Sequence, residues 1–267
     1  MKLKFFKSVW GMEGTLESQF SRIAQAGYDG IEANLPSAEN ENQFKELLHK
    51  YELEFILQIN TYGDHISTFE EQVHEGLKYQ PMLINSHSAK DSMPYEEQVN
   101  FFEKAVAIEK QVEVPICHET HRSRPLFTPW TTAQLLRDIP DLKINADFSH
   151  WCCVCESLLE GHEENVQLAI ERAILIHSRV GYAQGPQVPD PRAPEYKREL
   201  EVHESWWDRI IAHAASKGCE YFPITSEFGP PGYMHTLPYT NQPVANLWDV
   251  CLWMKNRLEE KYTKYTI

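Results

Sequence analysis

The stretch VPICHE at residues 114–119 has the length and apolar composition of a buried strand, and it ends in a glutamate. Three later stretches have the same design: LKINAD at 142–147, AILIHS at 173–178 and EYFPITSE at 220–227. Each of them carries an aspartate, a histidine or a glutamate at or next to its last position. Roughly one strand–helix unit separates each of the first three stretches from the next, which predicts consecutive β-α units of a parallel sheet.

The same alternation of short strands and amphipathic helices runs along the whole chain. The expected strands are 2–9, 28–34, 53–60, 81–87, 114–119, 142–147, 173–178 and 220–227. The first helix is expected from Thr15 to Gly27, a residue that suits a left-handed C-terminal cap, and Thr68 with Glu71 has capping-box spacing for the third helix. Eight such units without a domain-boundary linker predict a single (β/α)8 TIM barrel over residues 1–267, with an open doubly wound sheet as the alternative.

The composition is that of a globular enzyme. Of the 267 residues, 42% are hydrophobic and 24% are charged, which are ordinary proportions. The formal net charge of −14 weighs against a nucleic-acid partner, because such proteins neutralise phosphates with a basic surface. No apolar run is long enough to span a membrane and residues 1–10 do not resemble a signal peptide, so we expect a cytoplasmic protein without a membrane partner.

The polar residues at the later strand ends indicate a metal site. In a barrel the carboxyl ends of the strands face a common cup. Three carboxylates and one imidazole would repel one another there unless a cation were bound, although each residue alone is also compatible with a helix cap or a salt bridge. We therefore expect one divalent metal ion bound by Glu119, Asp147, His177 and Glu227. The oxygen and nitrogen donors favour Mn²⁺, with Mg²⁺, Co²⁺ or Zn²⁺ as alternatives.

Five short motifs at strand ends carry a family resemblance. They are Asn-Ser-His-Ser at 85–88, His-Glu-Thr at 118–120, Asp-Phe-Ser-His at 147–150, His-Ser-Arg at 177–179 and Ser-Glu-Phe-Gly at 226–229. In these motifs the chain resembles the xylose isomerase-like TIM barrel superfamily, which contains sugar isomerases, epimerases such as the ketose 3-epimerases, and the related endonuclease IV. The resemblance covers essentially the whole chain.

The resemblance implies roles for the site residues. In the ketose 3-epimerases the ligands are Glu, Asp, His and Glu in this order, and the two glutamates also exchange protons with the substrate. Carried over, Glu119 and Glu227 are ligands and the acid–base pair, whereas Asp147 and His177 are ligands only. His150 would bind a substrate hydroxyl group or orient the metal shell. The implied activity is a divalent-metal-dependent sugar isomerase or epimerase that transfers a proton alpha to a carbonyl through an enediolate.

Other residues are candidates for substrate binding. Trp10 ends the first strand and would stack on a sugar or belong to the core, two readings that the sequence leaves open. Arg179 and Arg192 flank a Pro- and Gly-containing segment expected to lie over the cup, and either would bind substrate oxygens or form a surface salt bridge. His87 ends the fourth strand and is also expected at the site. His118, by strand alternation, is expected to point away from it.

The sequence leaves rival functions open. The same site would support a metal-dependent keto-sugar dehydratase or lyase that expels a β-hydroxyl group from the enediolate. An endonuclease IV-like phosphoesterase is disfavoured, because that family has a late Asp-x-His whereas here Asp190 is followed by Arg192. A sugar-binding or protein-binding barrel without catalysis is the remaining alternative. The expected partner is a small sugar or polyol, and a homodimer is one open oligomeric state because superfamily members often pair.

Overall fold

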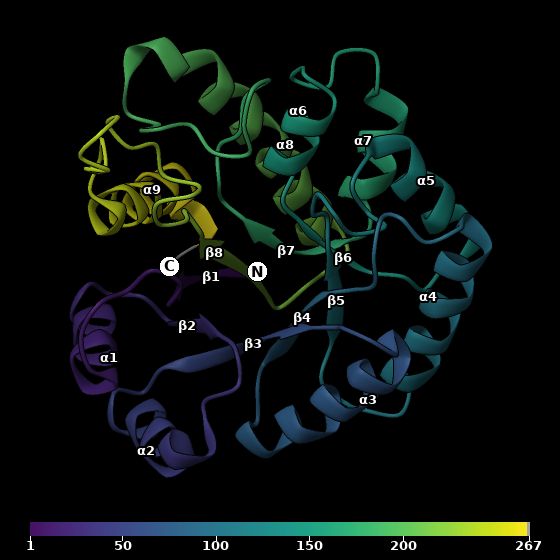
Figure 1. Cartoon of the computed structure of the whole chain (residues 1–267), viewed down its shortest axis with the longest axis horizontal. Helices are drawn as coiled ribbons and strands as arrows, with labels where there is room; N and C mark the ends of the chain where they lie inside the picture. The colour runs from purple at the N-terminus through teal and green to yellow at the C-terminus, as the bar shows by residue number, and fades with distance from the viewer. Residues whose placement is uncertain (266–267) are drawn as a thin grey trace.

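The computed structural model describes residues 1–265 and shows a barrel of eight parallel strands (Figure 1). The strands are β1 (Lys2–Ser8), β2 (Gly30–Ala33), β3 (Glu54–Asn60), β4 (Leu83–His87), β5 (Ile116–Glu119), β6 (Ile144–Ala146), β7 (Ala173–His177) and β8 (Tyr221–Ser226). Each strand pairs with the next one, and β8 pairs with β1, so the sheet closes. This closure confirms the (β/α)8 prediction and excludes the open doubly wound sheet. Residues 266–267 of the expected single domain lie outside the described residues.

The helices form the outer layer around the strands (Figure 1). They are α1 (Leu16–Gln25), α2 (Glu41–Lys50), α3 (His65–Gly76), α4 (Tyr95–Glu109), α5 (Pro129–Asp138), α6 (Ser149–Val154), α7 (Glu163–Ile170), α8 (Lys197–Ser216) and α9 (Leu247–Lys261). The short helix α6, which begins two residues after Asp147, was not predicted. Among the described helices, none combines the length and the apolar character that crossing a bilayer requires.

The helix ends show which local signals were interpreted correctly. Thr15, where the first helix was expected to begin, is the N-cap of α1, because its hydroxyl accepts a hydrogen bond from the backbone N–H of Ser18. Gly27 follows that helix with φ of +72°, the left-handed conformation expected of it. The capping-box prediction for α3 was wrong: the helix begins three residues earlier than Thr68, and Asp64 is its N-cap. Thr68 instead donates a hydrogen bond to the carbonyl of Tyr62.

Strand alternation divides the barrel into an apolar and a polar layer. One buried cluster consists of Phe6, Ile56, Leu83, Cys117 and Leu175, each at most 2% exposed. Two positions farther along β4, β5 and β7 lie Asn85, Glu119 and His177, and residues two apart on a strand share a face. The apolar cluster is therefore followed, toward the carboxyl ends of the strands, by a layer of polar side chains. The larger apolar core fills the space between the strands and the helices.

Candidate metal centre

The four predicted ligands lie together at the carboxyl ends of the strands. Glu119 ends β5, Asp147 follows β6, His177 ends β7 and Glu227 follows β8. Each offers one donor atom, and these atoms all lie within 4.8 Å of one another. All four side chains are buried. The barrel thus brings three carboxylates and one imidazole into a single cluster, which could bind a metal ion.

The ring of His177 is oriented toward the three carboxylates. Its Nδ1 lies 3.1 Å from Glu227 Oε2, 3.5 Å from Glu119 Oε2 and 3.9 Å from Asp147 Oδ2, yet it has no partner in hydrogen-bond geometry. Its Nε2 lies 3.0 Å from both carboxylate oxygens of Glu32. A carboxylate behind a ligating histidine fixes the ring and makes it a better donor. Glu32 therefore holds Nδ1 toward the centre of the cluster.

The donor set fits a divalent cation. Besides His177 Nδ1, the Oε1 atom of Glu119 is buried and has no hydrogen-bond partner. Buried polar atoms without partners are rare in folded proteins, and a bound metal ion would satisfy both of these atoms. Carboxylate oxygens with one imidazole suit Mn²⁺, Mg²⁺ and Co²⁺, and Zn²⁺ also accepts this set. Glu119, Asp147, His177 and Glu227 would each supply one atom to the ion.

The cluster perturbs the acidity of its own members. Burial raises the pKa of Asp147 to about 6, although Arg179 opposes this shift. For Glu227 burial acts in the same direction, but His177 and Arg179 outweigh it and lower the pKa to about 2. Burial alone would lower the pKa of His177, whereas the surrounding carboxylates, Glu32 first among them, raise it well above its ordinary value. Within the polypeptide itself, the positive charges of His177 and Arg179 thus offset part of the negative charge of the carboxylates.

Arg179 and His150 lie beside Asp147. The guanidinium of Arg179 forms an ion pair with Asp147 and lies 3.3 Å from Glu227 Oε2. Its Nη2 is 2.8 Å from His150 Nε2, and its Nε donates a hydrogen bond to Ser149 Oγ at 3.2 Å. Both side chains are almost completely buried. Arg179 reaches the cleft described next, whereas His150 is not among the residues that line it.

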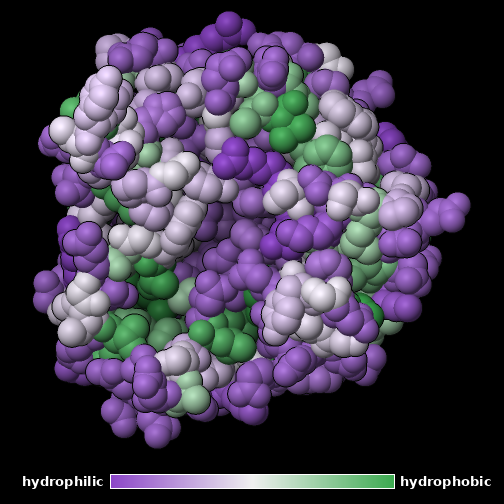
Figure 2. Space-filling view, in the orientation of Figure 1, coloured by the Kyte–Doolittle hydropathy of each residue, from purple (hydrophilic) through white to green (hydrophobic). Residues whose placement is uncertain are grey.

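A cleft of about 270 Å³ opens onto the cluster. Its lining includes the predicted site residues Trp10, His87, Glu119, Arg179 and Glu227. Figure 2 shows a hollow lined by hydrophilic residues in the middle of the face seen along the barrel. The Trp10 ring is 38% exposed, so it belongs to the cleft wall and not to the core.

Arg192 differs from the other predicted site residues, because it neither lines the cleft nor contacts the four-residue cluster. Its Nε and Nη2 donate hydrogen bonds to the two oxygens of Asp190, at 2.8 and 2.6 Å. The pair is partly exposed, and Arg192 does not line the cleft. Its guanidinium therefore has a local partner, as in the salt-bridge alternative.

Four residues of the site were missed by sequence reasoning. Glu32 supports His177, and Asn85 Nδ2 donates to Glu32 Oε1 and Glu119 Oε2, both at 2.9 Å. His121 lies between two other histidines, with ring centroids 4.6 Å from His87 and 3.9 Å from His150. Tyr233 packs edge-on against Trp10 in the cleft wall. A charged residue within the apolar strand 28–34, and a histidine two positions after Glu119, were the signals available for Glu32 and His121.

No protein-family model matches the chain, and no curated protein sequence matches it. Its structure is similar to that of a probable 3-DHS dehydratase from Bacillus anthracis, with a TM-score of 0.63 and 16% identity over 96% of this chain and 98% of that chain. It is equally similar to a D-tagatose 3-epimerase-like protein, with a TM-score of 0.63 and 15% identity over 98% of each chain. An AP endonuclease of family 2 from Brucella melitensis has a TM-score of 0.61 and 14% identity, over 96% of this chain and 98% of that chain.

These neighbours share a fold with the chain. They include epimerase, dehydratase and AP endonuclease representatives of the xylose isomerase-like barrel, and a xylose isomerase domain protein from Alicyclobacillus acidocaldarius has a TM-score of 0.59. The predicted resemblance to xylose isomerase-like TIM barrels is thus confirmed at the level of the fold. Most of the neighbours are enzymes, but one fold can support different reactions, so the activity has to be argued from the site.

Proposed function

We propose that the chain is a divalent-metal-dependent isomerase or epimerase of a small sugar. The observation that carries this proposal is the position of two glutamates, Glu119 and Glu227, which line the same cleft and also belong to the four-residue cluster around His177. A carboxylate next to a bound carbonyl compound can take up a proton from the adjacent carbon. Two carboxylates in one cleft can remove the proton and return it, which is what an isomerase or epimerase requires.

The side chains around the cluster prepare these glutamates for proton transfer. A divalent cation bound by Glu119, Asp147, His177 and Glu227 would polarise the substrate carbonyl and stabilise the negative charge that develops on it. Burial raises the pKa values of both glutamates, but neighbouring side chains outweigh it and lower them, His87 and His177 at Glu119 and His177 and Arg179 at Glu227, so both are deprotonated at neutral pH.

The rest of the cleft suits a small polyhydroxylated substrate. Its volume of about 270 Å³ is near the lower end of the usual range for ligand pockets. Amide side chains that can bind hydroxyl groups line one part of it: Asn34, Gln58 and Asn60. Trp10 and Tyr233 form an aromatic wall on which the apolar face of a sugar ring can stack. Sugar-sized substrates with a keto group are therefore the first class to test.

A dehydratase that acts on a keto-sugar is the second candidate. The same proton removal, followed by loss of a hydroxyl group from the neighbouring carbon, would release water and give an unsaturated product. The structural similarity to a probable 3-DHS dehydratase is the observation that favours it. The AP endonuclease neighbour gives the phosphoesterase alternative less support, since Asp190, where a late metal ligand would be expected, forms an ion pair with Arg192.

The deciding experiment is proton exchange with solvent. The chain is loaded with Mn²⁺ or Mg²⁺ and incubated in D₂O with a panel of ketoses, and the metal is chelated before NMR spectroscopy. We expect deuterium at the carbon next to the carbonyl together with an epimer or aldose product, and no exchange with metal-free protein. Product with the mass of one water less would indicate the dehydratase. Metal-loaded protein that exchanges no proton with any member of the panel would contradict both.

A further inference from the structure

We propose a second divalent-cation site in the same cleft, formed by His87, Glu119 and His121. It would share Glu119 with the first site, so that the carboxylate bridges two cations. His87 ends β4, Glu119 ends β5, and His121 follows two residues later. The proposal concerns cation binding alone and does not depend on the isomerase activity.

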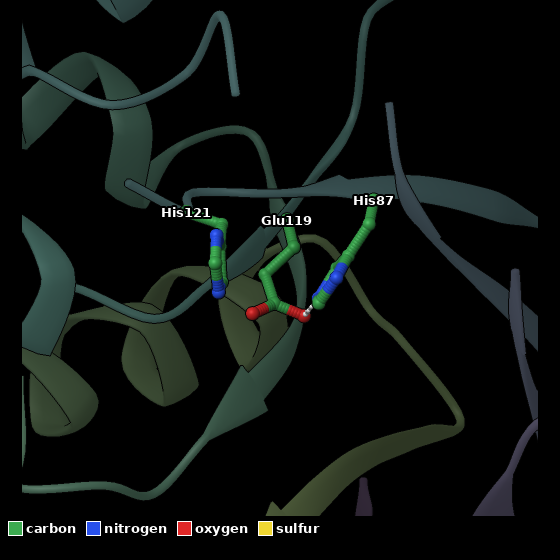
Figure 3. Close-up of side chains that lie close together, drawn as sticks. All are labelled: His87, Glu119 and His121. Carbon is green, nitrogen blue, oxygen red and sulfur yellow. Dashed lines mark hydrogen bonds and ion pairs between the residues drawn. The ribbon is translucent and has the colours of Figure 1, made fainter. Parts of the chain in front are cut away.

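The three side chains converge as metal ligands do. Each offers one donor atom, and these atoms lie within 4.8 Å of one another. Figure 3 shows the carboxylate of Glu119 between the two imidazole rings, with His87 Nε2 at 2.8 Å from Glu119 Oε2. The ring centroids of His87 and His121 are 4.6 Å apart. Since all three residues line the cleft, a cation among them would face the substrate.

Glu119 has the capacity to serve two cations. Its Oε2 accepts hydrogen bonds from Asn85 at 2.9 Å and Asn145 at 3.4 Å. The same oxygen lies 2.8 Å from His87 Nε2 and 3.5 Å from His177 Nδ1, whereas Oε1 has no hydrogen-bond partner. An ionised carboxylate has about four lone-pair positions on two oxygens. One cation beside His177 would therefore leave acceptor capacity on Glu119 for another.

The contacts of His121 place a lone pair on one of its ring nitrogens. Its Nδ1 contacts the carbonyl of Arg122, an arrangement that places the ring proton on Nδ1 and the lone pair on Nε2. Nε2 lies 3.3 Å from the hydroxyl of Tyr233, another residue of the cleft wall. The same hydrogen-bonding rule orients histidine ligands in known metal sites, so His121 is held in the tautomer that ligation needs.

The two sites would prefer different metals. Three carboxylates and one imidazole favour Mn²⁺ or Mg²⁺, whereas two imidazoles and one carboxylate with open positions are typical of catalytic Zn²⁺ and of Fe²⁺. Paired metal sites that share a carboxylate place two cations about 4 Å apart and let both contact one substrate. His87 would then be a metal ligand instead of the substrate-binding residue expected from the sequence.

The test counts metal ions per chain by equilibrium dialysis against Mn²⁺ and Zn²⁺ together, followed by elemental analysis. We expect two ions per chain in the wild type. His121→Gln and His87→Gln should each bind one ion fewer, and Asp147→Asn should weaken the first site while retaining the His87–Glu119–His121 ion. The matched control is His74→Gln, an exposed histidine on α3, which should bind two. Circular dichroism verifies the fold of each variant.

Two outcomes would overturn the proposal. One is a single ion per chain in the wild type at saturating Zn²⁺. The other is an unchanged count of two in folded His121→Gln and His87→Gln, which would place the second ion elsewhere. Co²⁺ provides an independent readout, because its visible absorption reports its ligands: the spectral change of the second equivalent should be lost in His121→Gln and kept in His74→Gln.

Discussion

The interior of the barrel has two layers with opposite chemistry, although the same strands build both. In the apolar layer the side chains of Leu83, Cys117 and Leu175 pack together. Two positions later on the same strands, Asn85, Glu119 and His177 form the polar layer. The apolar layer stabilises the fold by removing apolar surface from water. The polar layer buries charges, which costs free energy unless they are paired or bind a cation. A step of two residues thus separates the positions that hold the barrel together from those that form the candidate metal centre.

The largest effect is expected from Glu227→Gln in the polar layer. The amide keeps the shape of the side chain but cannot take up a proton at neutral pH, so proton exchange should fall by about 10²–10⁴-fold. Some metal should still bind through the other three ligands. Deuterium uptake by NMR measures the rate, and Glu220→Gln, an exposed residue just before the same strand, is the control. Full activity in Glu227→Gln would remove this residue from the acid–base pair.

Ile56→Ala tests the apolar layer. Ile56 is fully buried among the apolar side chains inside the barrel, so truncation should lower the free energy of unfolding by about 2–5 kcal/mol. The number of metal ions bound per folded chain should not change, because Ile56 is not one of the proposed metal ligands. Urea unfolding and metal analysis measure the two quantities. A loss of metal from folded Ile56→Ala would show that the layers are not separable.

Glu32→Gln tests the support of the proposed metal ligand His177. The glutamine can still contact Nε2 of the ring, but it lacks the charge that makes the imidazole a strong donor, so metal affinity should fall about 10–100-fold. Competition with a chelator measures the affinity. Glu54→Gln, which changes a partly exposed glutamate on the neighbouring β3, is the matched control. Equal affinities in the two variants would mean that Glu32 serves the fold and not the metal.

The success of the sequence prediction follows from which signals are local. The strand ends and the four converging residues could be predicted because each later strand carries its candidate ligand at or next to its own end. Strand alternation also gave the direction of His118, which points away from the cluster and pairs with Glu109 of α4 at 2.7 Å. The start of α3 was misplaced because Asp64 and Thr68 are both good N-cap residues and only the fold selects between them.

The residues that were missed depend on contacts distant in sequence. Glu32 and His177 are 145 positions apart, and a lone glutamate in a strand can equally well face outward into a salt bridge. His121 joins the cleft because the chain after β5 turns its ring between His87 and His150. Arg192 was expected at the site, but its nearest partner in sequence, Asp190, holds it at the surface. Local patterns therefore predicted the four residues that converge, whereas the residues around them required the three-dimensional arrangement.

The smallest effect concerns His203 of α8, which is as buried as His177 but has no carboxylate partner among the described residues. Its Nδ1 donates to the carbonyl of Glu199 at 2.8 Å, and its Nε2 accepts from the N–H of Gly181 at 3.1 Å. Burial lowers its pKa to about 4, the opposite direction from His177. Between pH 6.5 and 4 the unfolded chain therefore binds a proton more readily than the folded chain, so the free energy of unfolding falls as the pH falls through this window.

Above pH 6.5 the ring is neutral in both states and this contribution is constant. From pH 7 to 5.5 the wild type should lose about 1 kcal/mol more stability than His203→Gln, whose amide can still accept the hydrogen bond from Gly181. Urea unfolding at a series of pH values measures the difference. Parallel pH profiles would show that His203 does not titrate in this range. A steeper profile in the wild type would show that burial keeps His203 neutral in the folded chain, in contrast to His177, whose pKa the surrounding carboxylates raise.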